Sequence, residues 1–117
     1  MSARPPHGIC LPVTYNRCRD GDTIEVSVTG ALVWAIRISG IDCPEKRDHG
    51  GFEASDFTNR ICDDADRLSL FITCPEKMNI LKELSFDRVV GDIFVESSEH
   101  NGWLSDLLVD AGHAKRV

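Results

Sequence analysis

The first forty residues carry a hydrophobic pattern that suits a sheet. Three segments, residues 9–19, 23–29 and 32–41, alternate apolar and polar side chains, which is the period of a strand with one buried face. Asp20-Gly21 separates the first two segments and Gly30 separates the last two, and both are turn signals. The sequence therefore predicts an antiparallel meander of three strands.

The repeat of the apolar residues changes after residue 51. They then recur every three or four positions, as on one face of a helix, at Ala54, Phe57, Ile61, Ala65 and Leu68. Residues 68–73 and 88–96 are again strand-like and rich in β-branched and aromatic side chains. Residues 75–85 have no clear period and are predicted to be a loop, with one short extended piece at residues 78–81.

A second helix is expected near the end of the sequence. Asn101 suits its N-cap and Gly112 suits its C′ position. The apolar stripe between them consists of Trp103, Leu104, Leu107, Leu108 and Ala111. Trp103 is interpreted as a core residue because it belongs to this stripe.

The predicted order is therefore β-β-β-α-β-β-α. This is a β-rich α+β fold, and five strands with a helix after the third are typical of a Greek-key barrel of the OB type with two helices. A length of 117 residues suits one domain. We assign residues 1–12 to an N-terminal arm and the start of the first strand, and residues 13–117 to a single OB-fold domain.

Composition limits the classes of function. The formal net charge is −6, so contact with phosphates must come from a few placed arginines rather than from a generally basic surface. No apolar run is long enough to span a bilayer, and no membrane partner is expected. The five cysteines include no Cys-x-x-Cys pair, which favours reduced thiols over a zinc site or disulfides. Residues 1–8 lack the apolar stretch of a signal peptide, which indicates the cytoplasm if this terminus is native and leaves secretion open if a leader has been removed.

One group of charged residues suits phosphate and metal chemistry. Arg37 is expected on the outer face of the third strand, with Asp42 and Glu45 on the loop that follows it. If the first hairpin lies near this loop, Asp22 and Asp42 supply two carboxylates for a hard cation, and Glu45 points at a metal-bound water. Arg37 and Arg88, on separate strands, are placed to hold one phosphate from two sides.

Each of these residues also has a simpler interpretation. Asp20-Gly21-Asp22 is a common hairpin turn, and residues 42–45 are a common polar loop. Arg37 on an outer strand face is often solvated or paired across strands with an acid such as Glu25. The four histidines share no ligand spacing and are expected at the surface.

Five motifs in order resemble the staphylococcal nuclease-like (thermonuclease) family. They are Asp-Gly-Asp-Thr at 20–23, Arg37 followed by Ile-Asp-Cys-Pro-Glu at 41–45, Glu-Ala-Ser-x-Phe-Thr at 53–58, Arg-x-x-Gly-x-x-x-Val at 88–95 and Leu-Leu-Val-x-x-Gly-x-Ala at 107–114. Each motif is weak alone, and their compatible spacing over residues 13–114 is what makes the resemblance specific. The fold that it implies is again a five-stranded OB barrel with helices.

The resemblance implies a Ca²⁺-dependent nuclease that cuts DNA and RNA and leaves 3′-phosphate ends. By resemblance, Asp22, Asp42 and the backbone carbonyl of Cys43 bind Ca²⁺. Glu45 is the general base or orients the attacking water, and Arg37 and Arg88 stabilise the charge of the transition state. The expected substrate is single-stranded, and the expected state is a monomer.

Departures from the family pattern bear on affinity and substrate preference. Phe86-Asp87 stands where the family often has Tyr-Gly, residues 75–85 look like an insertion, and the chain is acidic. Two other functions therefore stay open: a catalytically silent nucleic-acid-binding or protein-interaction module of the same fold, and a structural calcium-binding domain.

Overall fold

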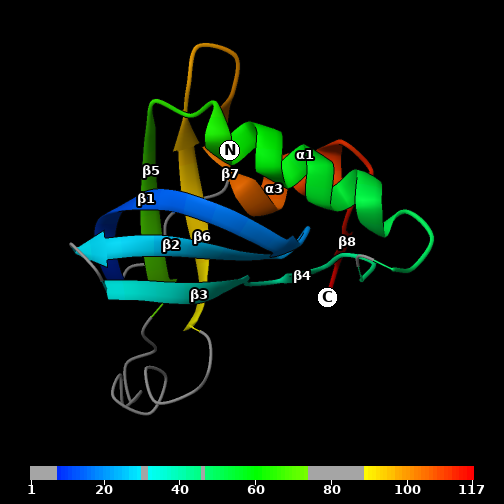
Figure 1. Cartoon of the computed structure of the whole chain (residues 1–117), viewed down its shortest axis with the longest axis horizontal. Helices are drawn as coiled ribbons and strands as arrows, with labels where there is room; N and C mark the ends of the chain where they lie inside the picture. The colour runs from blue at the N-terminus through cyan, green and yellow to red at the C-terminus, as the bar shows by residue number, and fades with distance from the viewer. Residues whose placement is uncertain (1–7, 30–31, 46, 74–88) are drawn as a thin grey trace.

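A computed structural model describes residues 8–29, 32–45, 47–73 and 89–117 (Figure 1). Its long strands are β1 (Gly8–Asp20), β2 (Thr23–Thr29), β3 (Leu32–Ile38), β5 (Arg67–Thr73) and β6 (Val89–Glu96). The short strands are β4 (Ile41–Asp42), β7 (Asn101–Trp103) and β8 (Lys115–Arg116). The helices described are α1 (Gly51–Asp63) and α3 (Leu104–Asp110).

The five long strands close into an OB-like barrel. Neighbouring strands pair in the order β3-β2-β1-β5-β6, and β6 then pairs in parallel with β3 to complete the circle. β1 takes part in both halves, because its first residues pair with β5 and its later residues pair with β2. The α+β class, the five-stranded barrel and the helix after the third long strand are as predicted.

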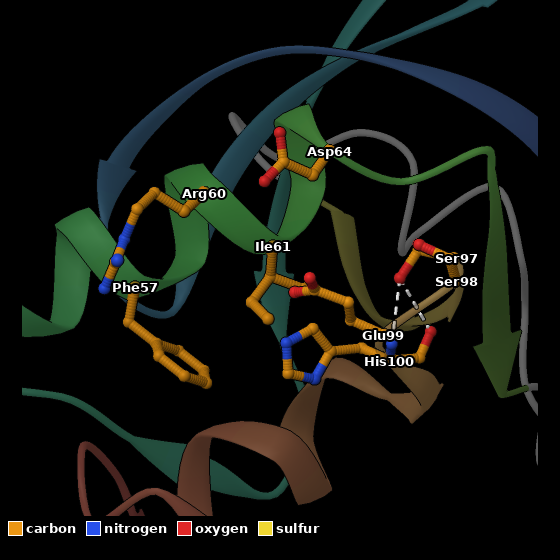
Figure 2. Close-up of a pocket in the computed structure, with 8 residues that line it drawn as sticks. All are labelled: Phe57, Arg60, Ile61, Asp64, Ser97, Ser98, Glu99 and His100. Carbon is orange, nitrogen blue, oxygen red and sulfur yellow. Dashed lines mark hydrogen bonds between the residues drawn. The ribbon is translucent and has the colours of Figure 1, made fainter.

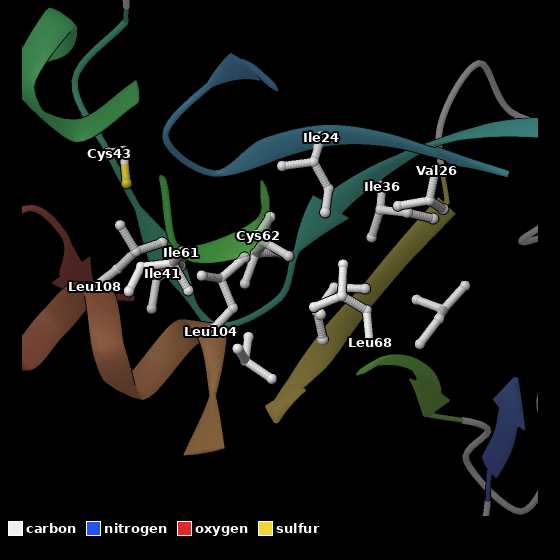
Figure 3. Close-up of a cluster of buried hydrophobic side chains, with 14 of the residues drawn as sticks. Ile24, Val26, Ile36, Ile41, Cys43, Ile61, Cys62, Leu68, Leu104 and Leu108 are labelled. Atoms are coloured by element: carbon white, nitrogen blue, oxygen red, sulfur yellow. The ribbon is translucent and has the colours of Figure 1, made fainter. Parts of the chain in front are cut away.

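The core fills the interior of this barrel and the space beneath the two helices (Figure 3). In β2 and β3 the alternation that predicted the strands also selects the buried side chains, since Ile24, Val26, Ile36 and Ile38 are fully buried. Leu70 and Ile93 continue the same layer from the other side, and Leu104 and Leu108 close it from α3. Among the described residues, no helix is long and apolar enough to cross a membrane.

The third strand is shorter than the predicted range of residues 32–41. β3 ends at Ile38, and the chain bends at Gly40, which has a left-handed φ of 75°. It then forms β4, which leaves the barrel to pair with β8. The bend matters for the candidate site because it sets where Asp42 lies.

The first helix ends before Ala65 and Leu68, which were predicted to lie on its apolar face. α1 stops at Asp63, and Leu68 instead points into the core from β5. Leu68 faces inward from β5 but lies at helical spacing from Ala65, so the periodicity alone predicted a helix that was too long. The predicted loop at residues 75–85 and the extended piece at residues 78–81 lie outside the described residues.

The predicted N-cap of the closing helix was wrong. Asn101 lies in β7, and the helix begins at Leu104 with Trp103 as its N-cap. Trp103 is buried as expected, against Phe71 and Phe94. At the other end, Gly112 occupies the predicted C′ position with a φ of 82°.

Candidate functional site

The tip of the first hairpin is pressed against α1. A Cβ atom on Gly21 would lie 2.8 Å from the Cβ of Ala54 and 3.1 Å from Cys43 Sγ, so only glycine fits this approach. The Thr58 hydroxyl, fully buried on α1, donates a hydrogen bond of 2.7 Å to the Gly21 carbonyl. These contacts with α1 therefore fix the position of the turn that carries Asp22.

We expect Gly21→Ala to lower the free energy of unfolding by about 1–3 kcal/mol, because the added methyl must push the hairpin tip away from backbone-anchored Ala54. Gly102→Ala is the matched control, since nothing lies within 4 Å of its added Cβ. Urea denaturation of both variants measures the difference. Equal stability of the two variants would contradict the close approach at Gly21.

Asp22 connects the hairpin tip to the loop after β4. Its carboxylate is almost fully buried and accepts a hydrogen bond of 2.9 Å from the Cys43 backbone N–H through Oδ2. Its other oxygen accepts one of 3.2 Å from the Thr23 hydroxyl. The Asp22 backbone carbonyl accepts from Ile38 N–H at 2.8 Å. These contacts join the turn to the end of β3.

Arg37 lies between two carboxylates. Its Nη2 atom is 3.3 Å from Asp22 Oδ2 and 3.2 Å from Asp42 Oδ1, so one nitrogen bridges the hairpin tip and β4. Its Nη1 atom donates to the Ile38 carbonyl at 2.6 Å. The Arg37 side chain is one-fifth exposed, whereas the Asp42 side chain is two-thirds exposed at 67%. The structure thus brings together Asp22, Arg37 and Asp42.

The simpler alternative, a pair between Arg37 and Glu25, does not form. β2 and β3 are in a register that places Arg37 opposite Thr23 and Glu25 opposite Ala35. Glu25 Oε2 instead accepts from Arg17 Nη2 at 2.8 Å and from Arg19 Nε at 2.7 Å. Arg37 pairs instead with Asp22 and Asp42 at the end of the barrel.

Cys43 contributes its backbone and not its thiol. The side chain is buried in the core, and burial together with the Asp22 charge raises the pKa of the thiol to about 12. It therefore stays protonated at neutral pH and is neither a nucleophile nor a thiolate ligand.

Glu45 lies apart from this cluster. Its carboxylate is 67% exposed and 3.8 Å from Arg47 Nε. Within the part of the chain that the structure describes, it makes no ion pair with Arg37. Arg88 lies outside the described residues, but its neighbour Val89 pairs with Ile36, and Val90 pairs with Arg37. The backbone of β6 thus begins beside the strand that carries Arg37.

Lys115 is a neighbour of the cluster that the sequence did not indicate. It pairs across the β4–β8 ladder with Asp42. Two-residue strands have no hydrophobic period, so neither β4 nor β8 had a recognisable pattern. Thr58 belongs to the motif at 53–58, but its hydrogen bond to Gly21 was missed, because a threonine inside a helix gives no sign of a distant acceptor.

The cluster supplies some, but not all, of the oxygen ligands that a hard cation requires. Asp22 and Asp42 offer carboxylate oxygens, which are the ligands that Ca²⁺ prefers, and they converge on a cationic group that already offsets their repulsion. Among the described residues, however, no group of three or more His, Cys, Asp or Glu side chains is placed to hold a metal. Backbone carbonyls, water and a substrate phosphate would have to complete the shell.

A separate hollow of about 420 Å³ lies at the far end of α1 (Figure 2). Phe57, Arg60 and Ile61 line it from the helix, and residues 97–100 line it from the turn after β6. That turn is fixed by hydrogen bonds between Ser97 and His100. None of the candidate site residues lines this hollow.

Neither a protein-family model nor a curated protein matches the chain. Its function must therefore be inferred from its own residues and their geometry.

Proposed function

We propose that the protein is a Ca²⁺-dependent nuclease, a hydrolase that cleaves phosphodiester bonds of single-stranded DNA, with RNA as a second substrate, and leaves 3′-phosphate ends. The observation that supports this most is the position of Arg37 between Asp22 and Asp42. The motifs that resemble the staphylococcal nuclease-like family supply these same three residues in the same order. Membership of that family is part of the proposal.

The proposed role of Arg37 follows from its geometry. A guanidinium can donate two parallel hydrogen bonds to phosphate oxygens, and its charge opposes the negative charge that develops on them. In the free protein its Nη2 atom is engaged by Asp22 and Asp42. Asp22 and Asp42 would hold Ca²⁺, which would offset their charge and screen the phosphodiester. The Arg37 guanidinium would donate to the substrate phosphate.

The two carboxylates have different proposed tasks because their surroundings differ. Asp22 is buried and held on both oxygens, so it provides a fixed ligand whose position does not depend on substrate. Asp42 is exposed on β4 and provides a second ligand at the open side of the cluster. We assign the Cys43 carbonyl as a third oxygen by the family resemblance.

Glu45 and Arg88 complete the proposal as predictions from the motifs. Glu45 would accept the proton of the attacking water. Its carboxylate is exposed and lies 3.8 Å from Arg47 Nε, so it is open to a water at the edge of the site. Arg88 would donate to the phosphate from the side of β6.

The proposal is tested with a fluorescent single-stranded oligonucleotide and the purified chain. We expect fragments with 3′-phosphate ends in Ca²⁺ and intact strands in a chelator. Asp42→Ala is expected to weaken Ca²⁺ binding in a calorimetric titration and to leave the fold intact, because that side chain is exposed. Intact strands in both conditions would contradict the nuclease, and an unchanged titration would move the metal site elsewhere.

A silent nucleic-acid-binding module is the second candidate. It is favoured by the hydrogen bonds that already occupy Asp22 and by the lack, among the described residues, of an ion pair between Glu45 and Arg37, since a purely structural network would look the same. This candidate predicts that oligonucleotides bind but are not cut, with or without Ca²⁺. The same cleavage assay, combined with a binding measurement, separates the two candidates.

A further inference from the structure

A groove of about 280 Å³ runs between β1 and the first half of α1. Its lining consists of Arg17, Cys18, Phe52, Ser55, Asp56 and Asn59. It begins beside the hairpin tip, because Cys18 precedes the turn by two residues and Ser55 follows Ala54, the residue that Gly21 approaches. The groove and the Arg37 cluster therefore lie next to the same turn.

Phe52 gives this groove an aromatic wall. Its side chain is 68% exposed, and it is the one aromatic residue among those described that falls in the exposed class. It lies in the first turn of α1 and contributes nothing to the core of the barrel. An exposed phenyl ring beside a groove offers a face on which a planar group can stack.

The other side chains of the groove are polar. Ser55 is 5% exposed, and its hydroxyl has no hydrogen-bond partner in the described structure. A buried hydroxyl without a partner is destabilising, and a polar ligand edge that reaches it would supply one. Asn59 accepts a hydrogen bond from the Tyr15 hydroxyl through Oδ1, which orients its amide. The groove thus combines an aromatic face with amide, carboxylate and hydroxyl groups.

Charge at the rim favours an anionic backbone next to the planar group. Arg17 is two-thirds exposed at the groove, and Arg19 lies two residues along the same strand. Both guanidiniums share the single carboxylate of Glu25. The carboxylate of the groove, Asp56, is paired with Arg60 at 3.2 Å, so these five side chains together carry one net positive charge. A planar, polar-edged ring attached to an anionic backbone fits these features.

We propose that the groove binds one unpaired nucleobase of a single-stranded polynucleotide, with the base stacked on Phe52 and its polar edge directed at Asn59 and Asp56. This inference rests on the proposed function, because it treats the groove as the continuation of the strand whose phosphate lies at Arg37. It also explains how a chain of net charge −6 can hold nucleic acid, since stacking on an aromatic ring does not require a basic surface. A base inside a duplex has no free face and its Watson–Crick edge is paired, so the groove selects single strands.

The test compares two fluorescent oligonucleotides of the same length, one normal and one with abasic positions at its centre. Binding is measured by fluorescence anisotropy in a chelator, so that no strand is cut. We expect the wild-type protein to bind the normal strand more tightly than the abasic strand. Phe52→Ala should lose about tenfold or more in affinity for the normal strand and almost none for the abasic strand.

Two variants serve as controls. Phe52→Trp keeps an aromatic face and should bind the normal strand at least as well as the wild-type protein. Leu32→Ala removes an exposed apolar side chain at the start of β3, outside the groove, and should not change binding. Because Phe52 is exposed and outside the core, circular dichroism should show that its variants remain folded.

The outcomes separate the groove from the nuclease. If Phe52→Ala binds both strands like the wild-type protein while the wild-type protein cleaves in Ca²⁺, the base site is wrong and the proposed function stands. If the wild-type protein does not distinguish the normal strand from the abasic strand, the base site is also wrong. If the wild-type protein neither binds nor cleaves, with or without Ca²⁺, both proposals fail.

Discussion

Arg37→Lys is expected to slow phosphodiester cleavage by about 10²–10³-fold, because lysine places a point charge where a planar fork of donors is required. Lysine can still pair with Asp22 or Asp42, so the barrel should stay folded and lose little stability. The measurement is the rate constant for cleavage of a single-stranded oligonucleotide at saturating Ca²⁺, with thermal unfolding recorded on the same sample.

Arg67→Lys is the matched control for this variant. Arg67 is an exposed arginine at the start of β5 and lies outside both the Arg37 cluster and the groove. Its replacement should leave the cleavage rate unchanged. A normal rate for Arg37→Lys would show that Arg37 is a structural counter-ion of the two aspartates rather than a donor to the phosphate.

Asp92 is expected to make the protein less stable as the pH rises from about 4 to about 6. Its carboxyl lies between β6 and the start of α3, where it accepts hydrogen bonds from Ile93 N–H at 2.8 Å, from Ser105 N–H at 3.3 Å and from the Ser105 hydroxyl. Burial nevertheless raises the pKa of Asp92 from 3.8 to about 6. The folded state therefore binds a proton in this pH range that the unfolded state has already released, and stability falls with pH.

Asp92→Asn measures this effect because asparagine is neutral at every pH. Its carbonyl can accept from the two backbone N–H groups, and its amide can donate to the Ser105 hydroxyl. From pH 4 to pH 7 we expect the free energy of unfolding of the variant to rise relative to the wild-type protein by about 2 kcal/mol. Urea denaturation at a series of pH values provides the comparison, and a constant difference across that series would contradict the shift.

Glu25→Gln should show the opposite trend. The pKa of Glu25 is lowered by hydrogen bonds from Arg17 and Arg19, so its stabilising contribution is present above its unfolded pKa and is lost as the pH falls through the folded value. Replacing it should reduce stability near neutral pH and have less effect in acid. The two variants together separate the contribution of the Asp92 carboxyl from that of the Glu25 carboxyl.

The barrel was predictable because its long strands keep one face in the core. Ile24 and Val26 in β2, and Ile36 and Ile38 in β3, are buried at alternate positions, and this alternation is visible in the sequence. The errors arose where a residue has two plausible roles. Asn101 has the side chain of an N-cap, but Asp92, from a strand that pairs beside it, supplies the carboxylate at the helix start.

The candidate site was predictable only in part. A hairpin signal at Asp20-Gly21 and a strand end near Asp42 were enough to suggest that their carboxylates lie close together, and both now contact Arg37. The hydrogen bond from Cys43 N–H to the Asp22 carboxylate and the one from the Thr58 hydroxyl to the Gly21 carbonyl depend on tertiary packing that no residue pattern encodes. The position of Glu45 depends on the loop between β4 and α1, whose turns are not periodic.

The parallel seam between β3 and β6 has a consequence for refolding. Pairing of residues 36–38 with residues 89–91 joins segments far apart in the chain, and such pairing forms slowly because a long loop must close first. The hairpin of β1 and β2 is local and should form early. Arg37 lies in this seam. A partly folded chain in which only the hairpin has formed would therefore still lack the pairing of β6 beside Arg37. Recovery of the proposed cleavage activity after dilution from denaturant should therefore follow the slowest kinetic phase and lag behind the return of β-sheet signal.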